Sequence, residues 1–243
     1  AKEDKKDNKS AKTNTVNSLT GEQIAELSVF IYGRLVGGRQ GLNQIRKTAV
    51  ERGKISIKNA DGTTENASYE LRTMRGESLD KEKIRFDQEF PSSKFALIYS
   101  DNKIIGVFND SVFTPREEAA KSFQNQIWRG IEALIRYKEN GATINLIGKE
   151  KYMGAEYNVI ELTDKENLKT RFFVSAKTFR VMWIEYTEGE IKYQRKFYDY
   201  RESQGTLVPY RSVLFANGKQ VEEITISTVT YGQKMEETIF QTS

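Results

Sequence analysis

The sequence of 243 residues has no cysteine, no histidine and only three prolines. Without cysteine the chain has no disulfide, no thiolate nucleophile and no cysteine-ligated zinc or iron–sulfur site. Without histidine it lacks the usual general base near neutral pH and the commonest metal ligand, which excludes a Ser-His-Asp triad. Catalysis by carboxylates, lysine or tyrosine stays chemically open, but these absences favour a binding protein over an enzyme, with no metal and no cofactor expected.

Charge and hydropathy exclude two more classes of protein. Lysine and arginine outnumber aspartate and glutamate, 38 against 34. Half of this excess lies in the first 18 residues, which leaves a net charge of only +2 over the rest of the chain and no arginine-rich block there. Nucleic-acid binding is therefore not expected. No run approaches the roughly 18–20 apolar residues of a membrane span, so contact with a membrane is expected to be peripheral at most.

The first 18 residues, AKEDKKDNKSAKTNTVNS, form a polar segment without apolar periodicity. Such a composition predicts a disordered leader, followed by a single domain over 19–243. The leader resembles the start of a mature secreted protein whose signal peptide has been removed. A tag remnant or a cytosolic tail is the alternative interpretation.

A first amphipathic helix is predicted to begin at Thr20, because Gln23 three residues later completes a capping-box pattern. Its apolar face follows helical spacings through Ile24, Leu27, Ile31 and Leu35. Two glycines at 37–38 end this helix, and a short helical turn follows near residues 42–45.

A second, longer helix is predicted over 115–140. Thr114 caps it, Pro115 fits the first helical position and Glu117 completes another capping box. Its apolar stripe consists of Ala120, Phe123, Ile127, Ile131, Leu134 and Ile135. The pair Asn140-Gly141 marks its end.

Alternation of apolar and polar residues predicts β-strands through the rest of the chain. They fall at 54–58, 69–72, 83–87, 95–99 and 103–108 before the second helix, and at 143–150, 155–163, 168–175, 179–187, 190–199, 207–216 and 220–230 after it. A last edge strand is expected at Ile239-Phe240. About eleven strands is the size at which a sheet curls, and two amphipathic helices need an apolar surface to cover. The predicted fold class is therefore α+β, a strongly curved antiparallel half-barrel with helices packed on its concave side.

Three groups of segments resemble the periplasmic outer-membrane lipoprotein carriers (LolA/LolB-like), especially the larger outer-membrane lipoprotein-sorting relatives. They are Leu35-Val36-Gly37-Gly38 with Leu42, Ile45 and Arg52-Gly53-Lys54-Ile55; Arg171-Phe172-Phe173-Val174 with Lys177-Thr178-Phe179; and Tyr198-Asp199-Tyr200-Arg201 with Gly205 and Leu207-Val208-Pro209. The last group resembles a strand that ends in an aspartate-tyrosine turn. The resemblance implies a periplasmic protein that holds the acyl chains of a lipid or lipoprotein inside the half-barrel, as a carrier or acceptor. The alternative on the same fold is a regulatory module that binds an envelope protein without transporting lipid.

The candidate cavity residues are inward members of the strands and of the second helix. They are Ile84, Phe86, Phe95, Leu97, Tyr99, Phe123, Ile127, Trp128 and Ile131. The plain alternative is that all nine are ordinary core residues, because packing decides between a cavity and a solid core.

Two polar groups also need an interpretation. Residues 199–201 either anchor a polar headgroup or satisfy backbone groups at the end of a strand, and the second role is favoured. Four carboxylates, Glu156, Glu161, Glu185 and Glu190, suggest a hydrolase with paired acids. Their spacing defines no site, and solvated strand faces explain them better.

Overall fold

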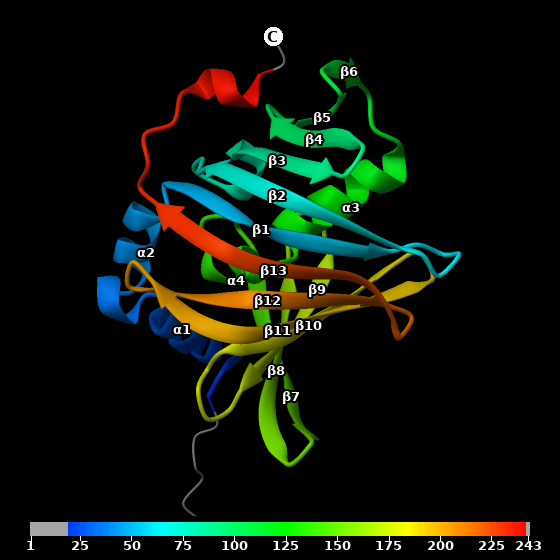
Figure 1. Cartoon of the computed structure of the whole chain (residues 1–243). Coiled ribbons are helices and arrows are strands. Elements are labelled where there is room, and N and C mark those ends of the chain that lie inside the picture. The colour runs from blue at the N-terminus through cyan, green and yellow to red at the C-terminus, as the bar shows by residue number, and fades with distance from the viewer. Residues whose placement is uncertain (1–18, 242–243) are drawn as a thin grey trace, which may run out of the picture.

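The computed structural model describes residues 19–241, in which thirteen strands form one antiparallel sheet (Figure 1). The strands are β1 (Thr48–Lys58), β2 (Thr64–Met74), β3 (Lys83–Phe90), β4 (Ser93–Ser100), β5 (Lys103–Phe108), β6 (Ser111–Phe113), β7 (Thr143–Tyr152), β8 (Ala155–Thr163), β9 (Lys169–Ser175), β10 (Val181–Glu188), β11 (Ile191–Ser203), β12 (Thr206–Ala216) and β13 (Lys219–Tyr231). The predicted leader at 1–18 lies outside the described residues.

Four α-helices and three short 3₁₀ helices complete residues 19–241. They are α1 (Gly21–Tyr32), η1 (Arg34–Val36), α2 (Arg39–Ile45), η2 (Leu79–Lys81), α3 (Glu117–Trp128), α4 (Ile131–Ile135) and η3 (Glu237–Phe240). None of the helices in this part of the chain is both long and apolar enough to span a membrane.

The sheet consists of two meanders that meet in its centre. The order of neighbouring strands is β6-β5-β4-β3-β2-β1-β13-β12-β11-β10-β9-β8-β7, so the first strand pairs with the last. The segment with α3 and α4 leaves one edge, at β6, and returns to the other edge, at β7. Figure 1 shows this green segment behind the sheet, crossing its concave side.

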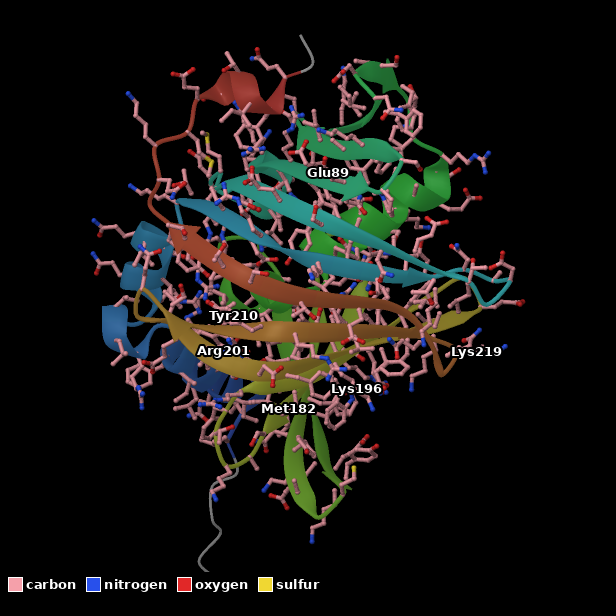
Figure 2. All side chains as sticks on the ribbon, viewed as in Figure 1. Glu89, Met182, Lys196, Arg201, Tyr210 and Lys219 are labelled. Carbon is pink, nitrogen blue, oxygen red and sulfur yellow. The ribbon has the colours of Figure 1, made fainter. Side chains whose placement is uncertain are left out.

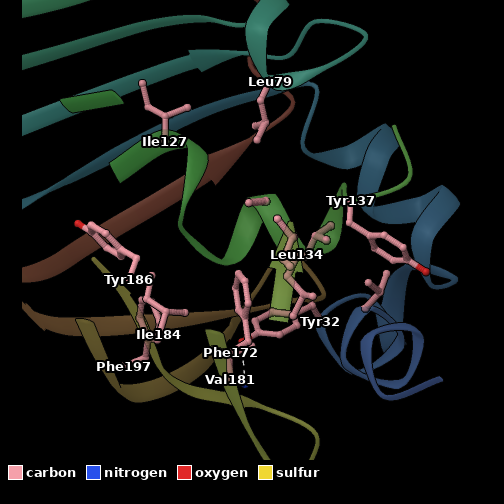
Figure 3. Close-up of a cluster of buried hydrophobic side chains, with 14 of the residues drawn as sticks. Tyr32, Leu79, Ile127, Leu134, Tyr137, Phe172, Val181, Ile184, Tyr186 and Phe197 are labelled. Atoms are coloured by element: carbon pink, nitrogen blue, oxygen red, sulfur yellow. Dashed lines mark hydrogen bonds between the residues drawn. The ribbon is translucent and has the colours of Figure 1, made fainter. Parts of the chain in front are cut away.

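Alternation along the strands separates an inner face from an outer one. Ile160, Phe172 and Ile184, from three neighbouring strands, belong to the main core together with buried residues of α1, α3 and α4 (Figure 3). Their sequence neighbours Val159, Phe173 and Trp183 form a separate cluster on the opposite face. The helices therefore cover the concave face, which confirms the predicted open half-barrel, with thirteen strands instead of about eleven.

The start of α1 is the predicted capping box. The backbone N–H of Gln23 donates to Thr20 Oγ1 (3.2 Å), and that of Thr20 donates to Gln23 Oε1 (2.8 Å). The predicted apolar stripe is confirmed at Ile24, and Ile31 packs partly buried against the core, but the buried face is otherwise formed by Ala25, Ser28, Val29 and Tyr32 and not by Leu27 and Leu35. Leu35 lies beyond the helix end and is 58% exposed, since the chain turns into η1 there.

The second helix differs from its prediction at both ends. It begins at Glu117 after Arg116, without a side-chain cap, so neither Thr114 nor a second capping box starts it. It also stops at Trp128. Gly130 takes an extended conformation (ψ −172°), and the Arg129 guanidinium turns away to donate to the carbonyl of Lys169 (2.9 Å). One predicted helix is therefore a helix, a break and the five-residue α4.

Two further predictions at strand ends are wrong. Ile239 and Phe240 belong to η3 and form no edge strand; Phe240 is buried, and Arg85 Nη1 donates to the Ile239 carbonyl (3.1 Å). β11 does not end at Asp199 but continues to Ser203; Asp199 takes a left-handed conformation (φ 53°) without a shift in register, since Tyr198 faces Arg211 and Tyr200 faces Pro209. Pro209 has no N–H to donate to the ladder at this point.

Candidate functional site

A cavity of about 290 Å³ lies between the concave face of the sheet and the α3–α4 segment. Its walls come from strands on both sides of the β1–β13 pair, where the two meanders meet. They are β1, β2 and β3 of the first meander and β11, β12 and β13 of the second. The lining is mainly apolar, including Leu71, Ile84, Phe123, Ile127, Ile131, Phe197, Leu207, Ile224, Ile226 and Val229. The space between the α3–α4 segment and the sheet is therefore a cavity and not a solid core.

Four of the nine predicted cavity residues line this space: Ile84, Phe123, Ile127 and Ile131. The other five lie in the packing around it. Phe86 stacks behind Phe123 with ring centroids 6.2 Å apart, and the Trp128 ring meets Tyr99 edge-on at 6.4 Å. Leu97 is buried in the core beside them, whereas Phe95 is partly buried near the sheet edge. Contact of the nine with a ligand stays a prediction.

One polar corner of the cavity joins three elements through ion pairs. Glu132 of α4 accepts hydrogen bonds from both Arg46, at the end of α2, and Arg75, just after β2. Both guanidinium groups are nearly enclosed, with 7% of each side chain exposed. Burial alone would raise the pKa of Glu132, but the two arginines outweigh it and hold that pKa at about 2.

A second ion pair holds the same helix. Arg136, directly after α4, donates to Glu82 and to the carbonyl of Gly76 (2.7 Å), and both charged side chains are buried. Burial raises the pKa of Glu82 to about 7 despite the adjacent Arg136. Five charged groups thus fix α4 to the segment between β2 and β3 and to α2.

The attachment of α3 is weaker. Only Phe123 and Ile127 of its twelve residues are buried. Its polar contacts with the sheet include Lys121 Nζ to Glu188 Oε1 (3.0 Å), from an exposed lysine, and the partly buried Gln126 Nε2 to Glu222 Oε2 (3.1 Å). Water can replace the exposed contact at little cost, and α3 buries few side chains, so α3 is the more easily displaced wall of the cavity.

Glu51 places a carboxylate on the inner face of β1. The Tyr69 hydroxyl donates to its Oε1 (2.7 Å), and burial raises its pKa, opposed by Tyr69 and by the positive charge of Arg46. Tyr69 can reach it because Gly53 leaves room: a Cβ there would lie 2.8 Å from the Tyr69 ring and 2.1 Å from the Thr225 carbonyl.

The sequence did carry a signal for Glu51. The inward residues Ile55 and Ile57 of β1 set a period of two, which continues backward to Gly53, Glu51 and Ala49. No comparable signal existed for Arg46, Arg75 and Glu132, because these residues are brought together only by the fold.

Residues 199–201 have structural positions. Tyr200 points inward, where its hydroxyl donates to the Val181 carbonyl and lies 2.9 Å from the Tyr32 hydroxyl. Arg201 points outward, with its guanidinium over the Tyr210 ring (4.9 Å; Figure 2). Tyr200 thus satisfies a backbone group as favoured, although inside β11 and not at its end.

The four carboxylates weighed as a hydrolase pair lie away from the cavity. Glu161 and Glu185, on the outer face, pair with Lys169 (3.1 Å) and Lys192 (2.8 Å), and Glu156, near the β7–β8 turn, pairs with Lys149 (2.9 Å). Glu190 is exposed in the turn before β11. Within residues 19–241 no group of three acidic side chains is arranged to hold a metal ion.

Solved structures of other proteins have a similar fold. No protein-family model and no curated protein matches the sequence. Among solved structures, a LolA superfamily protein from Nitrosomonas europaea superposes with a TM-score of 0.65 at 14% identity, covering 92% of this chain and 98% of that one. A DUF1329 family protein from Desulfovibrio piger gives 0.63 at 13% identity, covering 91% and 97%.

A third similar structure is an outer membrane lipoprotein-sorting protein domain from Vibrio parahaemolyticus, with a TM-score of 0.57 at 17% identity, covering 89% of this chain and 97% of that one. Nearly whole chains are matched in all three cases, at identities that establish the fold and nothing finer. The chain therefore has a LolA-like fold, as the sequence segments predicted.

Proposed function

We propose that this protein binds the hydrocarbon chain of a lipid or lipoprotein in the cavity beneath α3 and acts as a carrier or acceptor in the periplasm. The observation that carries the proposal is the apolar cavity between the concave sheet and the helices. The LolA-like fold supports it, since one similar structure is described as a lipoprotein-sorting domain. In this proposal the protein holds its ligand without transforming it.

The driving force is the transfer of hydrocarbon out of water. Each methylene buried contributes about 0.8 kcal/mol. The cavity, at about 290 Å³, lies near the lower end of the ~300–1,000 Å³ range of ligand sites, which suits one chain. A bulkier ligand requires α3 to move outward while α4 stays fixed by its ion pairs.

A cavity-filling substitution tests the proposal. Ile224 is a partly buried wall residue on β13, so Ile224→Trp fills the space from the sheet side. We expect the unmodified chain to bind dodecanol with micromolar affinity in titration calorimetry, and Ile224→Trp to weaken that binding at least tenfold.

The matched control is Ile147→Trp, at a half-exposed position of β7 outside the cavity. It should leave the affinity within about twofold. Absence of dodecanol binding by the unmodified chain, or equal binding by both variants, would exclude the cavity as the site.

A further inference from the structure

Glu51 differs from the other carboxylates in and beside the cavity. Glu132 pairs with Arg46 and Arg75, Glu82 pairs with Arg136, and Glu222 lies 2.9 Å from Arg195. For Glu51, no lysine or arginine nitrogen of residues 19–241 lies within salt-bridge distance, and the hydrogen bond it accepts from a side chain in that range comes from Tyr69.

The neighbouring cation is already engaged. Arg46 donates to Glu132 and to the carbonyl of Leu207 (3.0 Å), and its guanidinium lies over the Tyr231 ring at 5.2 Å. It lowers the pKa of Glu51 from a distance without contacting it, while burial raises that pKa more strongly. Glu51 therefore faces a largely apolar space with one oxygen held and the other free to accept.

Glu51 is half-buried at the cavity wall, and a carboxylate that is partly removed from water gains from a cation that meets it through a hydrogen bond. We infer that the ligand supplies the missing cation: the cavity takes an amphiphile with an amino group at its polar end, which donates to Glu51 while its chain lies along Leu71 and Ile224. This inference rests on the proposed function and specifies the head of the ligand. A carboxylate head at the same place would meet Glu51 as a like charge.

Three amphiphiles with the same hydrocarbon chain and different polar groups distinguish the contribution of the polar group to the affinity from that of the chain. Dodecylamine, dodecanol and dodecanoate, each as monomers at pH 7, are titrated into the full chain by calorimetry. We expect dodecylamine to bind at least tenfold more tightly than dodecanol, and dodecanoate to bind most weakly. Glu51→Gln should lower the affinity for dodecylamine about tenfold and leave dodecanol within about twofold.

Glu190→Gln is the matched control, because it removes the same charge from an exposed turn and should leave the order of affinities unchanged. The inference is overturned if dodecanoate binds as tightly as dodecylamine, or if folded Glu51→Gln keeps the full preference for the amine. Binding of dodecanol in those cases preserves the cavity proposal, whereas failure of all three amphiphiles to bind rejects both. The order measured with the unmodified chain tests the inference even if Glu51→Gln fails to fold.

Discussion

Glu132 is the residue on which two buried cations depend. Replacing it by glutamine leaves Arg46 and Arg75 enclosed without a counter-charge, and breaking a buried pair in this way costs about 3 kcal/mol. We expect Glu132→Gln to lower the free energy of unfolding in urea by that amount. Glu202→Gln breaks the exposed pair with Arg34 and should cost under about 1 kcal/mol.

Glu132 also makes the free energy of unfolding depend on pH. The folded pKa of Glu132, about 2, lies below its ordinary value of 4.5, so the folded state binds its proton less readily than the unfolded state. The stability from Glu132 is then present above pH 4.5 and lost as the pH falls toward 2. The difference in free energy of unfolding between the unmodified chain and Glu132→Gln should narrow from pH 5 to pH 2.5 in urea titrations. A constant difference over this range would contradict the assignment.

At the residue scale, the sequence could predict which face of a strand or helix a residue lies on, because the periodic pattern of apolar residues determines that face. Ile84 and Phe123 could be placed on the inner surface because each lies on the apolar face of a regular element. Whether such a residue borders space or packs solidly depends on neighbours from other elements, so Phe86 and Ile84 looked alike in sequence. The ion pair of Arg46 with Glu132 spans 86 residues of chain and left no local pattern.

At the scale of elements, α3 and α4 contrast in how they are held. α4 has three buried residues and is held by ion pairs among five charged groups, whereas α3 buries two side chains. We expect the backbone amides of α3 to exchange with deuterium faster than those of α1, when followed by mass spectrometry. Dodecanol should slow the exchange of α3 selectively. Equal protection of α1 and α3 in the free protein would show that α3 is not the displaceable wall.

The elements themselves were predicted unevenly. Hairpin turns and period-two alternation located the strands from β7 to β13 within a few residues, and the Thr20 capping box located α1. The break at Gly130 was missed because the apolar stripe continues across it in helical register. β6 was missed because three residues are too few to show alternation.

At the scale of the whole molecule, the main core takes side chains from both meanders, from β4 near one edge of the sheet to β7 at the other, which predicts a single cooperative domain. The two tryptophans report on opposite regions: Trp128 contacts Tyr99, and Trp183 stacks on Phe173 of the outer cluster at 4.4 Å. Trp183→Phe and Trp128→Phe each leave one reporter. In urea, the fluorescence transition of each variant should coincide with its loss of far-ultraviolet circular dichroism. If the Trp128 and Trp183 fluorescence transitions had different midpoints, the two meanders would unfold independently.

The pairing of β1 with β13 has a mechanical consequence. Ala49 faces Tyr231 at the end of this pair from which both chain ends depart, and Ile57 faces Glu222 at the far end. A force pulling Thr48 and Tyr231 apart would load the Ala49–Tyr231 rung first and unzip the ladder one rung at a time, instead of shearing all its hydrogen bonds at once. Under this load the sheet opens along its middle, and the two meanders stay connected through the segment with α3 and α4.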